Sequence, residues 1–230
     1  PLNDWLDACD AILAIGVGAS LESHAAGREV IQVDNDEESL NSNPSISLGI
    51  LADASDAITG LLGQLGEDAN SSCPALTETV SAINEFRYGP EEQLEPQRGF
   101  MDAIRAALPD DSVIVAGMNQ MGYYSRNYFS AYQPTTYLTS SSHGNLGCVY
   151  PIALGAKVAS PERAVLSVSG DGGFLYNSQE IATAVQYGIN AVAVVFNDNA
   201  YGNVMRAQID EFDGHVIGTK LHNPDFAAMA

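Results

Sequence analysis

The chain is poor in basic residues, in cysteine and in long apolar runs. Its 230 residues include 9 Lys plus Arg against 29 Asp plus Glu, which gives a formal net charge of −20 at pH 7. So large a negative charge disfavours binding to nucleic acid or to an anionic membrane surface. The apolar runs AILAIGVGA and AVAVVF are far shorter than the roughly 20 residues that a membrane-spanning helix needs. These absences favour a cytoplasmic protein that binds neither nucleic acid nor a membrane.

The few cysteines and lysines indicate the redox state and the salt concentration of the protein's surroundings. Cys9, Cys73 and Cys148 are far apart and odd in number, so they cannot form a closed disulfide framework, which favours a reducing compartment. Only two lysines occur, Lys157 and Lys220. An acid-rich, lysine-poor surface is typical of a halophile-like protein, because high salt screens its self-repulsion. An ordinary acidic cytoplasmic protein is the alternative.

The apolar content of the chain is enough for two folded units. Hydrophobic residues make up 46% and charged residues only 17%, which argues against an acidic disordered chain. Strand-type runs alternate with helical patterns, so we expect an α/β protein with two doubly wound parallel-sheet units. Residues 1–68 are expected to form a Rossmann-like unit, 69–97 a linker rich in Pro, Gly and Glu, and 98–230 the second unit. Because the chain starts without Met and stops within a helical pattern, we expect a piece of a longer protein, with both units truncated.

Periodicity and the placing of Pro and Gly predict particular elements. Apolar spacing predicts a helix in DAITGLLGQL, and a short helix is predicted around Val80–Phe86. In the second unit an amphipathic helix should end at Pro109, and strands are expected at Val113–Ala116, AVLSVS and NAVAVVFN. Asn177 and Glu180 have the spacing of a capping box, which predicts the beginning of a helix there.

The strongest local motif is GDGG, at residues 170–173. A DG dipeptide is most often a hairpin turn, but the segment that follows has a helical pattern rather than a strand pattern. Glycines before the N-terminus of a helix let backbone N–H groups meet a phosphate. Asp171 would repel that phosphate unless a cation lay between them.

A second polar cluster, NDNAYG at residues 197–202, follows the next expected strand. Both clusters should therefore lie at the carboxyl ends of neighbouring parallel strands, where open α/β sheets bind ligands. Oxygen-bearing side chains with no nearby Cys or His suit a hard cation such as Mg²⁺. Taken alone, NDN is equally explained as a polar loop with a helix cap.

These motifs resemble a known family. The stretch from Gly170 to Asn199 is similar to the diphosphate-binding motif of thiamine diphosphate (ThDP) enzymes, a GDG followed by an Asn/Asp cluster. The segment from HGNLG to the end of GDGGFLYNSQEIATAVQYGI resembles acetolactate synthase, benzoylformate decarboxylase and pyruvate oxidase. NAYGNVMRAQ and VIGTKLHNPDF resemble an acetolactate synthase-like branch, of the large catalytic subunit type. The first unit resembles the central domain of these enzymes more weakly, and the second their ThDP diphosphate-binding domain.

The resemblance implies a metal site and a cofactor site in the second unit. Carried over by position, the carboxylates of Asp171 and Asp198 and the carbonyl of Ala200 would hold Mg²⁺ against the diphosphate. Many members have Asn where this chain has Asp198, so we expect a tighter metal requirement or a raised carboxyl pKa there. The other residues implied to bind the cofactor are Asn119, Gln120, Gly144, Leu146, Gly170, Gly172, Gly173, Tyr201 and Gly202.

Three of these neighbours are given more specific roles. Leu146 matches the apolar residue that supports the bent cofactor, with an ordinary core Leu as the alternative. The carbonyl of Gly144 would accept a hydrogen bond from the aminopyrimidine. His143 stands where the family commonly has a small residue. It is predicted to be a general acid or a clamp for the substrate carboxylate, or a loop histidine without a catalytic role.

The turn at Gly16, Val17 and Gly18, followed by Asp34, is similar to a dinucleotide fingerprint, but its third glycine is missing. In acetolactate synthase relatives this domain either holds FAD in a non-redox role or is empty, and both alternatives stay open here. A nicotinamide dehydrogenase built on this turn is a further, less favoured hypothesis.

The resemblance implies a ThDP- and Mg²⁺-dependent lyase or transferase that decarboxylates a 2-oxo acid such as pyruvate. The product would be joined to a second 2-oxo acid, as in branched-chain amino acid biosynthesis. A decarboxylase or oxidase relative on the same cofactor is one alternative, and a non-catalytic cofactor-binding fragment is another. The family's activating Glu belongs to another domain, and its active sites form between subunits of a homodimer or homotetramer. We therefore expect weak ThDP binding and no turnover from these 230 residues alone.

Overall fold

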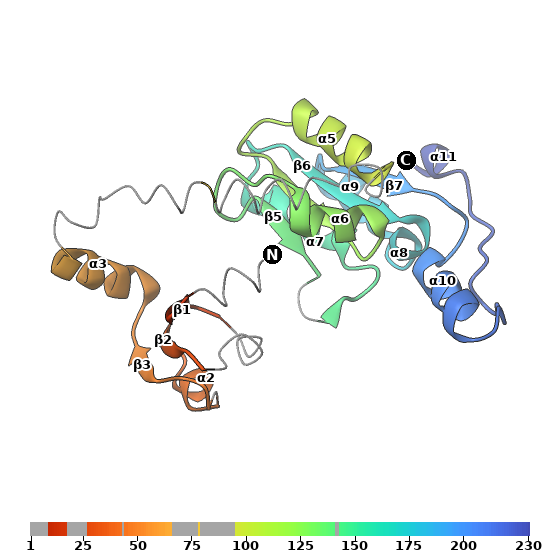
Figure 1. The fold of residues 1–230 in the computed structure, drawn as a ribbon. Coiled ribbons are helices and arrows are strands. Elements are labelled where there is room, and N and C mark those ends of the chain that lie inside the picture. The colour runs from red at the N-terminus through yellow and green to blue at the C-terminus, as the bar shows by residue number, and fades with distance from the viewer. Residues whose placement is uncertain (1–8, 18–26, 43, 66–77, 79–94, 141–142) are drawn as a thin grey trace. The chain divides into compact units, whose positions relative to one another are not determined.

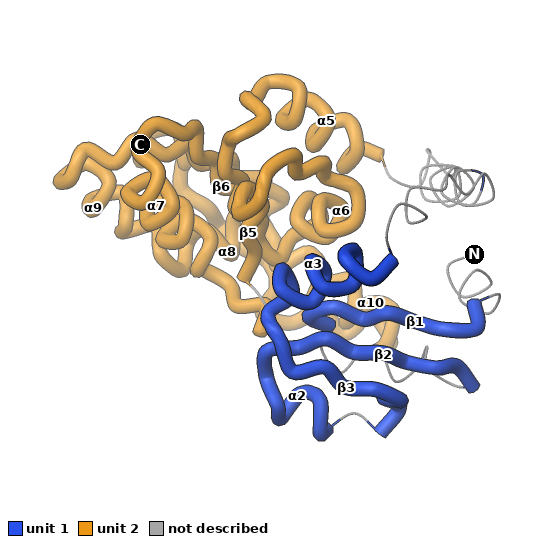
Figure 2. The backbone as a smooth tube through the Cα atoms, turned by 90° about the vertical axis from the view of Figure 1, so that its left-hand side faces the viewer, with its two compact units in different colours: residues 1–91 blue, residues 92–230 orange. Residues whose placement is uncertain are grey.

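The computed structural model describes residues 9–17, 27–42, 44–65, 78, 95–140 and 143–230. The chain divides into two compact units, residues 1–91 and 92–230 (Figures 1 and 2). The division falls within the predicted linker, whose own bounds stay a prediction because most of it lies outside the described residues. The helix predicted around Val80–Phe86 also lies outside them.

The described part of unit 1 is a three-stranded parallel sheet in the order β1-β2-β3. Its elements are β1 (Ala11–Ile15), β2 (Glu29–Asp34), α2 (Glu37–Ser42), β3 (Leu48–Leu51) and α3 (Ala54–Leu65). The helix expected in DAITGLLGQL is confirmed as α3. The buried apolar residues are Ala14, Val30 and Val33, which all come from the strands.

Unit 2 is built on four parallel strands in the order β5-β4-β6-β7. The strands are β4 (Val113–Ala116), β5 (Tyr137–Thr139), β6 (Val165–Gly170) and β7 (Val192–Phe196). The helices are α5 (Gln97–Ala107), α6 (Gln120–Tyr128), α7 (Val149–Ala159), α8 (Asp171–Leu175), α9 (Glu180–Tyr187), α10 (Gly202–Glu211) and α11 (Phe226–Met229). The α/β fold class is thus confirmed, and the strand predicted at Val113–Ala116 is β4. None of the described helices is long and apolar enough to cross a membrane.

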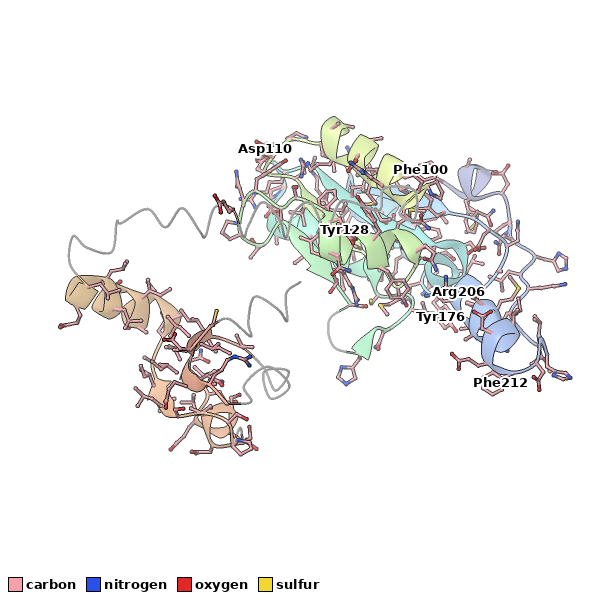
Figure 3. All side chains as sticks on the ribbon, viewed as in Figure 1. Phe100, Asp110, Tyr128, Tyr176, Arg206 and Phe212 are labelled. Carbon is pink, nitrogen blue, oxygen red and sulfur yellow. The ribbon has the colours of Figure 1, made fainter. Side chains whose placement is uncertain are left out.

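Helices cover both faces of this sheet because its central strands are apolar on both sides. On one face, Ile114 of β4 packs with Met101 of α5 and Met121 of α6. On the other face, Val115 packs with Val149 of α7. Phe100, labelled in Figure 3, adds an edge-to-face contact from α5 to Phe196 of β7, with ring centroids 5.3 Å apart. Unit 2 is therefore doubly wound.

The strand order creates a switch point in unit 2. From β4 the chain passes through α6 to β5 on one side, and it then returns through α7 to β6 on the other side of β4. Connections that leave neighbouring parallel strands in opposite directions open a crevice at the carboxyl ends of those strands. Gly117 and Asp171, which directly follow β4 and β6, therefore lie at the place where such a sheet holds a ligand.

The capping box predicted at Asn177 and Glu180 is wrong. A short helix, α8, already begins at Asp171, and α9 begins at Glu180 with Gln179 as its N-cap and no side-chain cap. The amide nitrogen of Asn177 instead donates to the carbonyl of Gly147 at 3.0 Å. Its amide oxygen accepts from Gln179 Nε2, also at 3.0 Å. The side chain is engaged by the loop before α7, so it connects two parts of the site rather than starting a helix.

Candidate functional site

A pocket of about 450 Å³ lies at the carboxyl ends of β4, β6 and β7 in unit 2. Its volume is in the range of sites that bind small organic ligands. Its lining comes mainly from the ends of the strands and from the turn before α7: residues 117–120, 144–147, 170–173, 196–198 and 200–204. The GDGG and NDNAYG motifs therefore meet at one pocket.

The structure brings the predicted site residues together with one exception. Those that line the pocket are Asn119, Gln120, Gly144, Leu146, Gly170, Asp171, Gly172, Gly173, Asp198, Ala200, Tyr201 and Gly202. His143 is exposed to solvent and does not line it. The role of His143 stays a prediction, and the pocket provides no support for it.

Two carboxylates face this site from different strand ends. Asp171 begins α8 with only 2% of its surface exposed, whereas Asp198 lies at the exposed rim. Partial desolvation and the negative charge of Asp171 raise the pKa of Asp198 above its ordinary range. The direction is the one expected when two like charges approach without a cation between them. A divalent cation would relieve this repulsion.

The NDNAYG loop is held in a tight turn. Asn199 has a positive φ of 58°, and its backbone N–H donates to the side-chain oxygen of Asn197 at 3.1 Å. The N–H of Ala200 donates to Asp198 Oδ1 at 3.2 Å. These bonds orient the side chains of Asn197 and Asp198 against their own loop, so one oxygen of each is already engaged.

Two glycines are required by close packing at the site. A Cβ on Gly172 would overlap the ring of Tyr201 and would lie 3.2 Å from Leu221 Cδ1. A Cβ on Gly202 would lie 2.8 Å from Asp198 Oδ2. Glycine at these positions therefore lets Tyr201 and Asp198 approach α8 and the start of α10.

Asn119 provides an unpaired donor in the pocket. Its side-chain oxygen caps α6 by accepting from the N–H of Gly122 at 2.7 Å. Its Nδ2 is buried and has no hydrogen-bond partner among the described residues. A buried donor without a partner is costly, so this N–H is suited to an acceptor on a ligand. Beside it, Gln120 Nε2 donates to Asn203 Oδ1 at 2.6 Å.

Leu146 is not a core residue. Its side chain is 38% exposed and lines the pocket. A Cβ on Gly173 would stand 3.7 Å from Leu146 Cδ2, so the side chain lies beside the GDGG backbone. The neighbouring Gly144 has a φ of +59° and turns the chain beside Met118. An apolar side chain in this place is available to support a ligand rather than the sheet.

The sequence analysis missed Asn223, which reaches the site from the loop before α11. Its Nδ2 donates to Asp171 Oδ2 at 2.6 Å and to Asn197 Oδ1 at 2.7 Å. The two partners are 52 and 26 residues away along the chain. The one available signal was the position of Asn223 in the segment VIGTKLHNPDF, which was noted for its resemblance without a role for this residue.

The fold and the site define an α/β cofactor-binding domain whose pocket lies at the switch point of the sheet. Residues 116–230 match the family described as thiamine pyrophosphate enzyme, C-terminal TPP binding domain. The chain therefore belongs to the thiamine pyrophosphate (ThDP) enzymes, and its relatives make it acetolactate synthase-like.

Curated relatives of several activities are similar to the chain over nearly its whole length. A probable 2-ketoarginine decarboxylase of Pseudomonas aeruginosa is 30% identical over 233 residues, which cover 98% of this chain and 42% of the relative. The acetolactate synthase large subunit of Haemophilus influenzae is 27% identical over 241 residues, covering 99% and 42%. A pyruvate oxidase of Lactiplantibacillus plantarum is 24% identical over 240 residues, covering 100% and 40%. The chain thus spans about two fifths of the length of these relatives.

Proposed function

We propose that this chain binds the diphosphate of ThDP through Mg²⁺ and serves the decarboxylation and carboligation of 2-oxo acids, as acetolactate synthase does. The observation that carries the proposal is the meeting of Asp171, Asp198 and the GDGG backbone in one pocket at the switch point of unit 2. ThDP supplies, when bound, the nucleophilic carbon and the electron sink for decarboxylation, and the protein supplies orientation and charge placement.

The donor set fits Mg²⁺. Among the described residues there is no group of three or more His, Cys, Asp or Glu side chains that could hold a metal. The pocket provides two carboxylates, those of Asp171 and Asp198, and the carbonyl of Ala200 is the proposed third protein ligand. Mg²⁺ is commonly bound by one or two carboxylates, with water and substrate phosphates completing its shell. Such a cation would also relieve the repulsion between Asp171 and Asp198.

The pocket residues fit both the diphosphate and the rings of the cofactor. The unpaired Nδ2 of Asn119 is a donor for a diphosphate oxygen, and the backbone of Gly172 and Gly173 carries no side chain that would block a close approach. Leu146 is proposed to support the bent cofactor from the opposite side, and the carbonyl of Gly144 to accept from its amino group. Holding the two rings in this orientation is the protein's contribution to reactivity.

The outcome of the reaction is a separate part of the proposal. Carboligation is favoured by the similarity to acetolactate synthase large subunits, whereas decarboxylation and oxidation are carried by other relatives. Measuring acetolactate against acetaldehyde from pyruvate, in the protein assembled with its remaining domains, separates carboligase from decarboxylase. Acetaldehyde without acetolactate would contradict the carboligase assignment.

Assembly and FAD belong to the proposal for the whole protein. We expect a homodimer or homotetramer with active sites between subunits, and no turnover by the 230 residues alone. In unit 1, Gly16 has a φ of +61° and its N–H donates to the carbonyl of Val33 at 3.0 Å, while Gly18 lies outside the described residues. FAD binding by this unit stays a prediction, to be checked by flavin absorbance of the purified protein.

Thermal unfolding with ThDP and Mg²⁺ tests the binding proposal. A ligand that binds only the folded state at about 100 times its Kd stabilises it by about 2.7 kcal/mol. We expect a clear rise in the unfolding temperature of the parent chain, and little or no rise for Asp171→Ala. No rise for the parent, or an equal rise for the variant, would contradict the proposal.

A further inference from the structure

The segment Thr219–Asn223 is bonded to the NDNAYG loop along its length. Ala200 and Lys220 form an antiparallel bridge. The N–H of Tyr201 donates to the carbonyl of Thr219, and the N–H of Leu221 donates to the carbonyl of Asn199, both at 2.8 Å. The later segment therefore fixes the backbone that presents Asp198 and Ala200.

Helix α10 holds the start of the same segment. Gln208 Nε2 donates to the carbonyl of Ile217, and Gln208 Oε1 accepts from the N–H of Ile217, both at 3.1 Å. The hydroxyl of Thr219 lies 3.5 Å from Gln208 Oε1. Because the segment is hydrogen-bonded to α10 near its start and to the NDNAYG loop in its middle, the position of Asn223 is fixed.

At that place Asn223 joins two strand ends. A single nitrogen, Nδ2, donates to Asp171 Oδ2 at 2.6 Å and to Asn197 Oδ1 at 2.7 Å. The other amide atom, Oδ1, is buried and has no partner among the described residues. Asp171, which accepts one of these bonds, is itself only 2% exposed.

The bond leaves Asp171 with one oxygen, Oδ1, that is not engaged by Asn223. Asp198 is similar, because its Oδ1 already accepts from the N–H of Ala200. In each carboxylate, one oxygen thus accepts a hydrogen bond from the protein, which makes that oxygen a weaker ligand for a metal than the other one. Mg²⁺ requires a near-octahedral shell, whereas Ca²⁺ accepts six to eight oxygens and readily takes carboxylates in the bidentate mode.

We propose that Asn223 is a positioning residue that keeps Asp171 monodentate and so gives the site its preference for Mg²⁺ over Ca²⁺. The inference rests on the proposed function, since it concerns the metal that would hold the diphosphate. It assigns no contact between Asn223 and the metal. Residues that orient metal ligands by hydrogen bonds change metal affinity by about 10- to 100-fold when they are removed.

The test compares the affinities of the chain for Mg²⁺ and Ca²⁺ at a fixed ThDP concentration, by titration with each chloride salt. Asn223→Ala removes both hydrogen bonds, and Asn223→Asp keeps the size of the side chain while removing the donor. We expect both variants to lower the affinity for Mg²⁺ by about tenfold or more and the affinity for Ca²⁺ by less, so that the ratio of Mg²⁺ to Ca²⁺ affinity falls. The matched control is His222→Ala, an exposed neighbour, which should leave the ratio unchanged.

A role confined to packing would weaken both metals alike, so a ratio within about twofold of the parent in Asn223→Asp overturns the inference. Unfolding curves without metal show whether each variant is folded. If Asn223→Ala does not fold, the affinity ratio of Asn223→Asp alone decides the test. A parent chain that shows no metal-dependent ThDP binding overturns the proposed function and this inference together. A parent that binds normally, with an unchanged ratio in the variants, overturns this inference alone.

Discussion

The carboxylates of the site are oriented by hydrogen bonds at single atoms. Asp171 and Asp198 each have one oxygen bonded within the protein, to Asn223 and to the N–H of Ala200. The raised pKa of Asp198 has its physical causes in desolvation and in the charge of Asp171. The residues thus form an arrangement that is unfavourable without a cation and well suited to one with phosphate oxygens in its shell.

The packing of Tyr201 against Gly172 gives a prediction at the residue scale. In Gly172→Ala the new methyl group would overlap the Tyr201 ring, so the ring and the NDNAYG loop must shift. We expect a loss of about 1–3 kcal/mol in the free energy of unfolding, as for other overpacked sites, and loss of the stabilisation by ThDP and Mg²⁺. Chemical denaturation with and without the ligands measures both effects.

Gly155→Ala is the matched control for this prediction. Gly155 lies in α7, and a Cβ there would meet no atom within 4 Å. An alanine should leave ligand binding unchanged and stabilise the helix by up to about 1 kcal/mol. If Gly172→Ala were as well tolerated as this control, the close packing of Tyr201 would not be a requirement of the site.

Single residues also show where sequence reasoning succeeded and failed. Asp171 and Asp198 could be placed together from the sequence because each follows a strand of one parallel sheet. Asn223 could not, because its partners are brought to it by the bridge between Ala200 and Lys220, which no local pattern predicts. Leu146 is ambiguous by periodicity, and its exposure at the pocket excludes a core residue, while its role as a ligand support stays a prediction.

The elements of unit 2 were largely readable from local patterns. The run VIVA is β4 because its four residues are buried and β-branched or small, as in a strand covered on both faces. The region after β6 could not be predicted correctly from local patterns, because it holds two short helices where one was expected. Asn177 could not be distinguished from a helix cap by spacing, since its actual partner, Gly147, is 30 residues away.

Asn119 links helix α6 to the pocket, and its two roles can be tested separately. Its side-chain oxygen caps α6, while its Nδ2 is buried without a partner among the described residues, in a residue that lines the pocket. Asn119→Ser keeps a capping oxygen and loses the amide donor, so stability should change little and ThDP affinity should fall. Asn119→Ala should lose the cap as well, at about 0.5–2 kcal/mol in the free energy of unfolding.

Denaturation curves and ThDP titrations of the two variants separate the roles of this residue. Equal ThDP affinity in the parent and in Asn119→Ser would show that the amide nitrogen does not serve the ligand. If Asn119→Ser were strongly destabilised but kept its ThDP affinity, the role of Asn119 would be confined to capping α6.

For the whole molecule, the sequence patterns bear on the fold, whereas the net charge bears on the solvent. The α/β class and the two units could be predicted from alternating strand and helix patterns, and the structure confirms the fold class. The charge of −20 does not determine the fold and bears instead on the solvent in which the chain is stable.

The net charge gives a prediction about salt. Screening of like charges should stabilise the folded chain, so raising KCl from about 0.1 to 1 M, where the Debye length falls from about 10 to 3 Å, should raise the unfolding temperature. Thermal unfolding in a series of KCl concentrations, without ThDP, measures this. An unfolding temperature that stays constant or falls with salt would contradict the interpretation of the acidic surface as an adaptation to high salt.

The proposed function requires that ThDP is held in unit 2 through a cation bound by Asp171 and Asp198. Calorimetric titration of the chain with ThDP, in Mg²⁺ and again in excess chelator, tests it most directly. ThDP binding should require the cation and should be abolished in Asp171→Ala. Equal binding in the chelator, or binding by Asp171→Ala as tight as by the parent, would contradict it.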